Sequence, residues 1–266
     1  MTVTTTIVDV TPETAREWLK ANTRNRHLRD ADVERYARDM REGRWQFTAE
    51  PIKFGLSGVL LDGQHRLHAI ARAGVTVKAL VVFGLEDDAQ HVMDTGAKRT
   101  VADALNLTGV KNAALCAAGA RLALLWESGR LFRDSKHQVV STAEVEEWLR
   151  EHPEFHDAVT RAAGYRHRID CQPSVVVAAY WRLSQVHADR TAEFFHGLAE
   201  LTNLEPGNPI LALHRRLTDL RRTRTSQRDL LALFILAWNR WRQGRSVTRL
   251  HVPQGRWTAE NFPTPI

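Results

Sequence analysis

The sequence has few cysteines and no long hydrophobic run. Its two cysteines, Cys116 and Cys171, lie far apart and belong to no C-x-x-C pair. Neither a disulfide framework nor a cysteine-based zinc site is therefore expected. No apolar run approaches the roughly 18 residues that a membrane-spanning helix needs, so we expect no membrane partner. The first residues also lack the basic flank and apolar segment of a secretory signal, which predicts a cytoplasmic protein.

Several motifs that mark catalytic or nucleotide-binding folds are also missing. The sequence contains no G-x-S-x-G, no H-E-x-x-H, no G-x-G-x-x-G and no G-x-x-x-x-G-K-[ST]. These absences argue against a serine hydrolase of the nucleophile-elbow type, a zinc protease, a dinucleotide-binding fold and a P-loop nucleotidase.

Positive charge is present and concentrated toward the C-terminal part of the chain. Residues 1–110 carry 15 Lys or Arg against 15 Asp or Glu, and residues 111–213 carry 11 against 13. Residues 214–256 contain 11 Arg, no Lys and two Asp, a net charge of +9. Such a stretch predicts either a surface that binds nucleic-acid phosphates or a solvated helical face. The candidate DNA contacts are Arg215, Arg216, Arg221, Arg222, Arg224 and Arg228.

Hydrophobic periodicity predicts two domains of different class. Strands are expected at residues 6–10, 51–54, 58–61 and 75–83, and helices between them at 11–22, 30–43 and 65–74. After about residue 110 only helical patterns remain, at 111–128, 142–151, 154–163, 173–187, 190–201, 209–222 and 226–243. We therefore expect an α/β domain over residues 1–110 and an all-α domain over residues 111–266.

The stretch LLDGQHRLHAI, residues 60–70, carries the most specific signal. A hydrophobic run ends at Asp62-Gly63, and a helix begins with His65 and Arg66 in its first turn. Cations at a helix N-terminus are unfavourable by about 0.3–1 kcal/mol each. An anion bound there would offset this cost, with Arg66 binding phosphate oxygens and His65 donating to them or moving a proton. The alternative is that Asp62 caps the helix while the basic side chains reach solvent.

The stretch DTGAKRT, residues 94–100, has the same order of glycine turn, two cations and helix start. It either binds the far end of a polyphosphate or is a solvated turn before a capped helix. Its candidate contacts are Asp94, Thr95, Gly96, Lys98, Arg99 and Thr100.

Elsewhere, Glu50 is a candidate general base or metal ligand, or else a plain surface glutamate. His65 and His68 are spaced as a metal pair, but no third ligand is visible, so the metal ligands stay unknown.

Three segments in this order resemble the N-terminal domain of the ParB/sulfiredoxin superfamily. They read NRHLRDADVERYARDMREGRWQ, EPIKF and GVLLDGQHRLHAIARAGVTVKALVV, and the D-G-Q-H-R form is similar to phage-type ParB-like proteins. Arg24 and Arg26 match the arginine loop of the family, and Pro51-Ile52 matches its strand. The catalytic cysteine of sulfiredoxins has no counterpart, and neither does the glutamate that free-serine kinases carry in the first loop. The resemblance covers about residues 5–110.

The resemblance implies nucleotide chemistry. ParB proteins bind and hydrolyse CTP and clamp DNA, while relatives of the same fold use ATP to phosphorylate an acceptor. By this likeness the phosphates of ATP or CTP, with Mg²⁺, would be held by Gly63, Gln64, His65 and Arg66. Lys98 and Arg99 would assist. A second copy of the chain, forming a homodimer, is considered as a further partner. A phage-encoded chain would act in the cytoplasm of its bacterial host.

Four functions are therefore considered. The sequence favours a nucleotide-binding and nucleotide-hydrolysing protein that also binds DNA. The second is a kinase acting on a hydroxyl of a small molecule or a modified DNA base, with Asp62 or Glu50 as base and His65 and Arg66 stabilising the transferred phosphoryl group. The third, a metal-dependent nuclease, has only Asp62, Glu50 and Asp94 near the motif to hold metal ions. The last is an adaptor whose nucleotide site has decayed.

Overall fold

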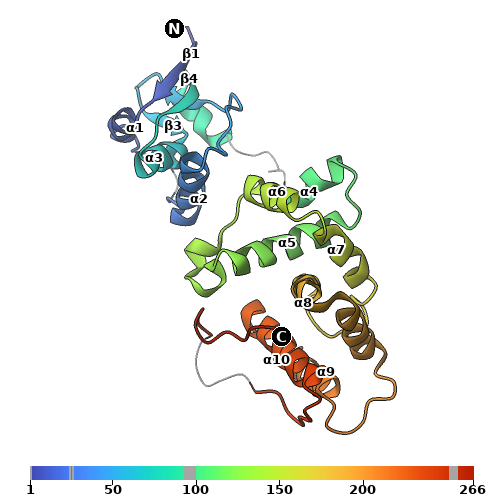
Figure 1. The fold of residues 1–266 in the computed structure, drawn as a ribbon. Helices are drawn as coiled ribbons and strands as arrows, with labels where there is room; N and C mark the ends of the chain where they lie inside the picture. Colours follow the sequence, from blue (N-terminus) through green and yellow to red (C-terminus); the bar gives the residue numbers. More distant parts are fainter. Residues whose placement is uncertain (1, 24, 26, 93–99, 252–256) are drawn as a thin grey trace. The chain divides into compact units, whose positions relative to one another are not determined.

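A computed structural model describes residues 2–23, 25, 27–92, 100–251 and 257–266. The chain forms two compact units (Figure 1). Unit 1 consists of Met1–Lys98 and Ser135–Glu144, and unit 2 of Arg99–Asp134 and Val145–Ile266. The sequence placed the boundary near residue 110, where the strand patterns stop. In the structure α4 (Val101–Leu107) packs on α5 (Ala113–Glu127) of unit 2, and residues 135–144 return to unit 1.

Unit 1 contains a small mixed sheet. Its strands are β1 (Thr4–Val10), β2 (Ile52–Gly55), β3 (Leu60–Asp62) and β4 (Val77–Leu85), in the order β1-β4-β2-β3. The β1–β4 and β2–β3 pairs are antiparallel, and the β2–β4 pair is parallel. The mostly apolar β4 lies inside the sheet, as its composition indicates. β2 and β3 form a hairpin around Ser57-Gly58.

Three helices and the sheet enclose the core of unit 1. They are α1 (Pro12–Leu19), α2 (Asp30–Arg41) and α3 (Gln64–Ala73). Apolar residues recur three or four positions apart on α2 and α3, so each helix has one buried stripe. The buried cluster combines both layers: Val10, Ile52, Phe54, Leu60 and Val81 from the strands, and Ala15, Val33, Ala37, Leu67 and Ile70 from the helices.

The described part of unit 2 is helical, as the sequence predicts. After α4 and α5 come α6 (Thr142–Glu151), whose first residues belong to unit 1, α7 (Phe155–Ala163), α8 (Pro173–Glu200), α9 (Pro209–Leu220) and α10 (Gln227–Arg242). Short 3-10 turns occur at η1 (Asp87–Val92), η2 (Arg130–Phe132) and η3 (Ser135–Gln138).

The long helix α8 is interrupted at His187, whose φ of −161° and ψ of 101° are not helical. This break confirms the two separate helices that the sequence predicts there. The apolar stripe of α10 forms core, because Phe234 and Trp238 are fully buried and pack on Phe194 and Phe195 of α8. Over the residues described, the helices are all too short or too polar to cross a bilayer.

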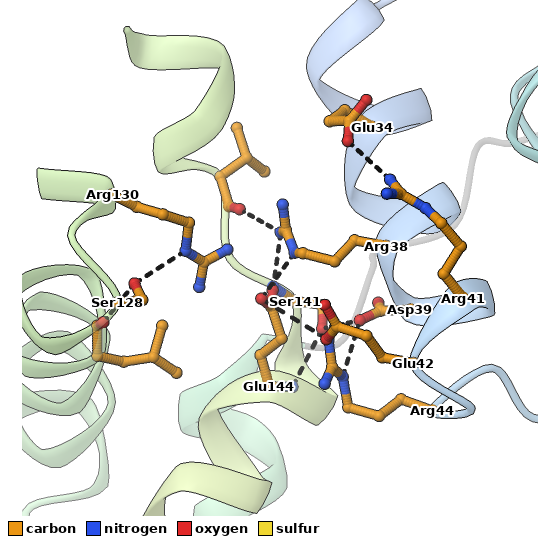
Figure 2. A network of polar contacts seen from close by, with 12 residues as sticks. Glu34, Arg38, Asp39, Arg41, Glu42, Arg44, Ser128, Arg130, Ser141 and Glu144 are labelled. Carbon is orange, nitrogen blue, oxygen red and sulfur yellow. Dashed lines mark hydrogen bonds and ion pairs between the residues drawn. The ribbon is translucent and has the colours of Figure 1, made fainter. Parts of the chain in front are cut away.

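A buried polar network holds residues 135–144 on α2 (Figure 2). The Nε and Nη2 atoms of Arg38 donate to the two carboxylate oxygens of Glu144 at 2.8 and 2.9 Å. Nη2 also donates to the carbonyl of Val139 at 2.7 Å. The side chain of Glu144 is only 5% exposed, so this ion pair is almost fully removed from water. Such a bidentate contact fixes both distance and orientation.

The same network caps the start of α6. The Ser141 amide donates to Glu144 at 2.7 Å, and the Glu144 amide donates to the Ser141 hydroxyl at 3.1 Å. This reciprocal pair is a capping box, and the spacing of Ser141 and Glu144 in the sequence is typical of one. The Ser141 hydroxyl also donates to Asp39 at 3.0 Å, and Asp39 pairs with Arg44 at 3.1 Å. Burial raises the pKa of Asp39 above its ordinary value, against the hydrogen bonds from Ser141 and Arg44.

Glu144→Gln should lower the free energy of unfolding by about 3 kcal/mol, because it leaves the buried Arg38 guanidinium without its compensating charge. Glu146→Gln, an exposed position on the same helix, should change it by less than about 0.5 kcal/mol. Urea unfolding followed by tryptophan fluorescence compares the two variants. Equal midpoints would contradict the role assigned to the buried pair.

Candidate functional site

The turn between β3 and α3 can form only because residue 63 is glycine. Gly63 has a φ of +107°, in the left-handed region, and is the N-cap of α3. A Cβ atom at this position would lie 3.1 Å from Cγ1 and 3.3 Å from Cα of Ile52. The backbone of the turn therefore runs directly against β2. A glycine N-cap also supplies no side-chain cap to the first turn of α3.

Asp62 places a carboxylate at the start of this helix. Its Oδ1 accepts a hydrogen bond from the Gly63 amide at 2.7 Å. Its Oδ2 lies 3.3 Å from Nζ of Lys53 and 3.4 Å from Nη2 of Arg66. Lys53 is opposite Asp62 in the β2–β3 register, so the pairing of the strands positions this contact. The carboxylate of Asp62 therefore offsets the positive charge of Arg66 in the first turn.

Arg66 also connects α3 to the segment before β2. Its guanidinium donates to the carbonyls of Glu50 and Pro51, the second at 2.8 Å. The side chain is 18% exposed, so most of it is covered. Glu50 contributes through its main chain, and the residue as a whole is exposed.

A chain of amide side chains connects the loop after α1 to the same helix start. Asn22 donates to Oε1 of Gln64 at 3.2 Å, and Asn25 donates to Oδ1 of Asn22 at 2.7 Å. Asn25 also donates to the Leu60 carbonyl at 2.6 Å. Gln64 is 5% exposed, so its side chain is buried within the turn and supports its shape.

His65 is oriented by the backbone before α2. Its Nε2 accepts a hydrogen bond from the Arg29 amide at 3.1 Å, which requires a ring with Nε2 unprotonated. Burial, and then the charge of Arg72, lower the pKa of His68. No group of three His, Cys, Asp or Glu side chains suited to a metal ion occurs among the residues that the structure describes.

The second predicted phosphate stretch falls largely outside the described residues. Asp94, Thr95, Gly96, Lys98 and Arg99 are among the residues not described, as are Arg24 and Arg26 of the predicted arginine loop.

Thr100 is described, and it is the N-cap of α4. Its amide donates to Asp103 at 2.8 Å, and the Asp103 amide donates to the Thr100 hydroxyl at 3.2 Å. The helix that follows this stretch is therefore closed by its own capping box.

The predicted DNA contacts lie in unit 2, on the α9–α10 hairpin. Four of the six arginines are exposed: Arg215, Arg221, Arg222 and Arg224. Arg216 and Arg228 are half-buried, and their Nε atoms are buried without a hydrogen-bond partner in the described part of the chain. The loop between the two helices thus carries most of the exposed positive charge of the predicted set.

Sequence reasoning missed Lys53 and the amides of Asn22 and Asn25. Lys53 lies between the buried Ile52 and Phe54, so strand alternation places it on the opposite face of β2. This alternation is the signal that could have found it. The amides of the loop after α1 carry no local signal for their partners, which lie 35 and 42 residues further along the chain.

A scan against protein-family models returned no match for this chain. Searches of curated proteins and of solved structures likewise returned no match.

Gly63→Ala should lower the free energy of unfolding by about 3 kcal/mol, because it combines left-handed strain with a contact against Ile52. Gly74→Ala is the matched control, since Gly74 ends the same helix with a φ of +72° and has no atom within 4 Å of the added Cβ. That variant should lose only about 1 kcal/mol. Chemical denaturation of both variants measures the difference, and similar losses would contradict the close approach as the cause.

Proposed function

We propose that this chain is a ParB-like protein that binds and hydrolyses a nucleoside triphosphate, ATP or CTP, and binds DNA. The nucleotide would bind in unit 1 at the start of α3, and the DNA would bind in unit 2 at the α9–α10 loop. The resemblance of residues 5–110 to the ParB/sulfiredoxin superfamily supports the first part. The exposed arginines of the loop support the second.

One observation carries the nucleotide proposal: a strand, a left-handed glycine and a helix meet beside two cations. The first turn of an α-helix presents backbone N–H groups toward an anion, and Gly63 lets the chain approach closely. Lys53 and Arg66 already share one carboxylate, that of Asp62, within 3.4 Å. A phosphate carries more negative charge than a carboxylate and would compete with Asp62 for Lys53.

The residues present at this turn are compatible with a nucleotide and its Mg²⁺. Backbone amides of Gln64, His65 and Arg66 would hold phosphate oxygens, Gly63 would let the chain approach them closely, and Lys53 would add positive charge. Mg²⁺ in nucleotide sites is usually held by one or two carboxylates together with the phosphates and water. Asp62 offers one such carboxylate. The metal would supply charge neutralisation of the phosphates, while Arg66 would hold the turn through the carbonyls of residues 50 and 51.

The geometry favours nucleotide binding over transfer to an acceptor. A kinase of this fold would need Asp62 or Glu50 to accept a proton from the acceptor hydroxyl. The Gly63 amide, Lys53 and Arg66 surround the Asp62 carboxylate. These contacts engage both of its oxygens in holding the turn. A nuclease would need clustered carboxylates for metal ions, and the described residues provide no such cluster.

Lys53→Ala should weaken nucleotide binding about tenfold, since one charge-assisted contact to phosphate is lost. The measurement is isothermal titration with ATP, CTP, GTP and UTP in the presence of Mg²⁺, together with phosphate release. Lys78→Ala is the matched control, because Lys78 also lies on a strand and pairs with an aspartate, Asp9 at 3.1 Å. Absence of binding by all four nucleotides, or equal effects of both variants, would contradict the site.

Replacing Arg221, Arg222 and Arg224 together by alanine should weaken binding to duplex DNA. The slope of log K against log salt should fall by about 2 to 3, because each phosphate contact contributes about 0.9. The matched control replaces three exposed arginines elsewhere in unit 2: Arg150, Arg240 and Arg245. Fluorescence anisotropy over a salt series gives both quantities. A triple variant that binds like the control would remove the α9–α10 loop from the DNA interface.

A further inference from the structure

The loop between α7 and α8 carries a second group of basic side chains. Arg166, His167 and Arg168 are consecutive and exposed in unit 2. They were not predicted from the sequence, because residues 111–213 are slightly acidic as a whole. Whether such a local basic group belongs to a larger basic surface depends on which residues lie next to it in the fold.

Its neighbours are the residues of the α9–α10 loop. Asp170 accepts a hydrogen bond from the Thr218 hydroxyl at 3.3 Å and lies 3.5 Å from Nη1 of Arg221. Gln227, at the start of α10, donates to Oε1 of Gln172 at 3.1 Å and to the Ser174 hydroxyl at 3.0 Å. Both ends of the α9–α10 loop are therefore in direct contact with the segment after Arg168.

We propose that the two loops form one continuous surface that binds the phosphate backbone of a single DNA duplex. In this surface Arg166 and Arg168 contact the same duplex as Arg221, Arg222 and Arg224. The inference rests on the proposed DNA binding and adds residues to its site.

The charge of the combined surface favours a polyanion. Segments 165–172 and 215–228 together contain eight arginines and two aspartates, a net charge of +6. Asp170 faces Thr218 and Arg221, and Asp229, just after the second segment, serves in the cap of α10 with Ser226. Arg168 pairs with Glu200, which reduces but does not cancel the positive charge of the first loop. Clustered arginines of this kind raise the local concentration of a negatively charged partner.

The lack of exposed aromatic rings favours a duplex over a single strand. Proteins that bind single strands stack bases on aromatic side chains. Tyr165 is half-buried, and its ring packs against Tyr180 at 6.4 Å and Phe195 at 6.2 Å. Segments 165–172 and 215–228 are fully described, and they present no exposed Phe, Tyr or Trp. Recognition through backbone phosphates alone suits a duplex with its bases stacked inside.

The test is the double variant Arg166→Ala/Arg168→Ala in the full-length chain. A labelled 20-base-pair duplex serves as the probe, with anisotropy measured over a salt series. The affinity should fall about tenfold, and the slope of log K against log salt should decrease by about 1 to 2. The control is Arg150→Ala/Arg240→Ala, which removes two exposed arginines outside both segments. Replacing both loop arginines by lysine should preserve the slope, and thermal melting shows whether each variant is folded.

Two results with duplex DNA would overturn the inference while leaving the proposed function intact. In the first, the Arg221/Arg222/Arg224 variant loses DNA binding but the Arg166/Arg168 variant behaves like its control. In the second, the wild-type chain binds two duplexes at once, which would place the loops on separate DNA molecules. Tighter binding of a single strand or an RNA of equal length would also overturn it. If the Arg221/Arg222/Arg224 variant itself binds normally, the DNA interface of the proposed function fails first.

Discussion

The carboxylate of Asp62 is the interaction on which the candidate site depends. The first turn of α3 carries Arg66, where the helix dipole disfavours positive charge. Asp62 offsets this by accepting from the Gly63 amide and by lying between Lys53 and Arg66. The turn is thus held together by an anion of its own. A phosphate entering the site would exchange with that anion, so ligand binding and the local structure of the turn would be coupled.

Local elements could be predicted from the sequence because their causes are local. The apolar run of β4 and the capping box at Ser141 and Glu144 each involve residues only a few positions apart. The turn at Gly63 could also be predicted, since only glycine readily adopts a φ of +107°. The break of the long helix near His187 could be predicted for the same reason, because the helical patterns on either side of it are local.

Contacts between distant parts of the chain could not be predicted in this way. Arg38 and Glu144 are 106 residues apart, and neither has a local pattern that names the other. The candidate site shows the same limit: the glycine turn was visible, but the support that Gln64 receives from Asn22 was not. The basic residues 166–168 before α8 could not be singled out for a related reason. The acidic residues in the rest of 111–213 outweigh their charge when the sequence is read along its length.

The division of the chain also has a consequence for its synthesis. Residues 99–134 are inserted between two parts of unit 1, and the later part carries Ser141 and Glu144. Until the ribosome has released residue 144, Arg38 lacks Glu144 and Asp39 lacks Ser141, the partners that they have in the finished fold. Unit 1 therefore cannot complete its packing cotranslationally before α5 has been made. A truncated chain ending near residue 110 would retain the whole sheet and yet lack these polar partners of α2.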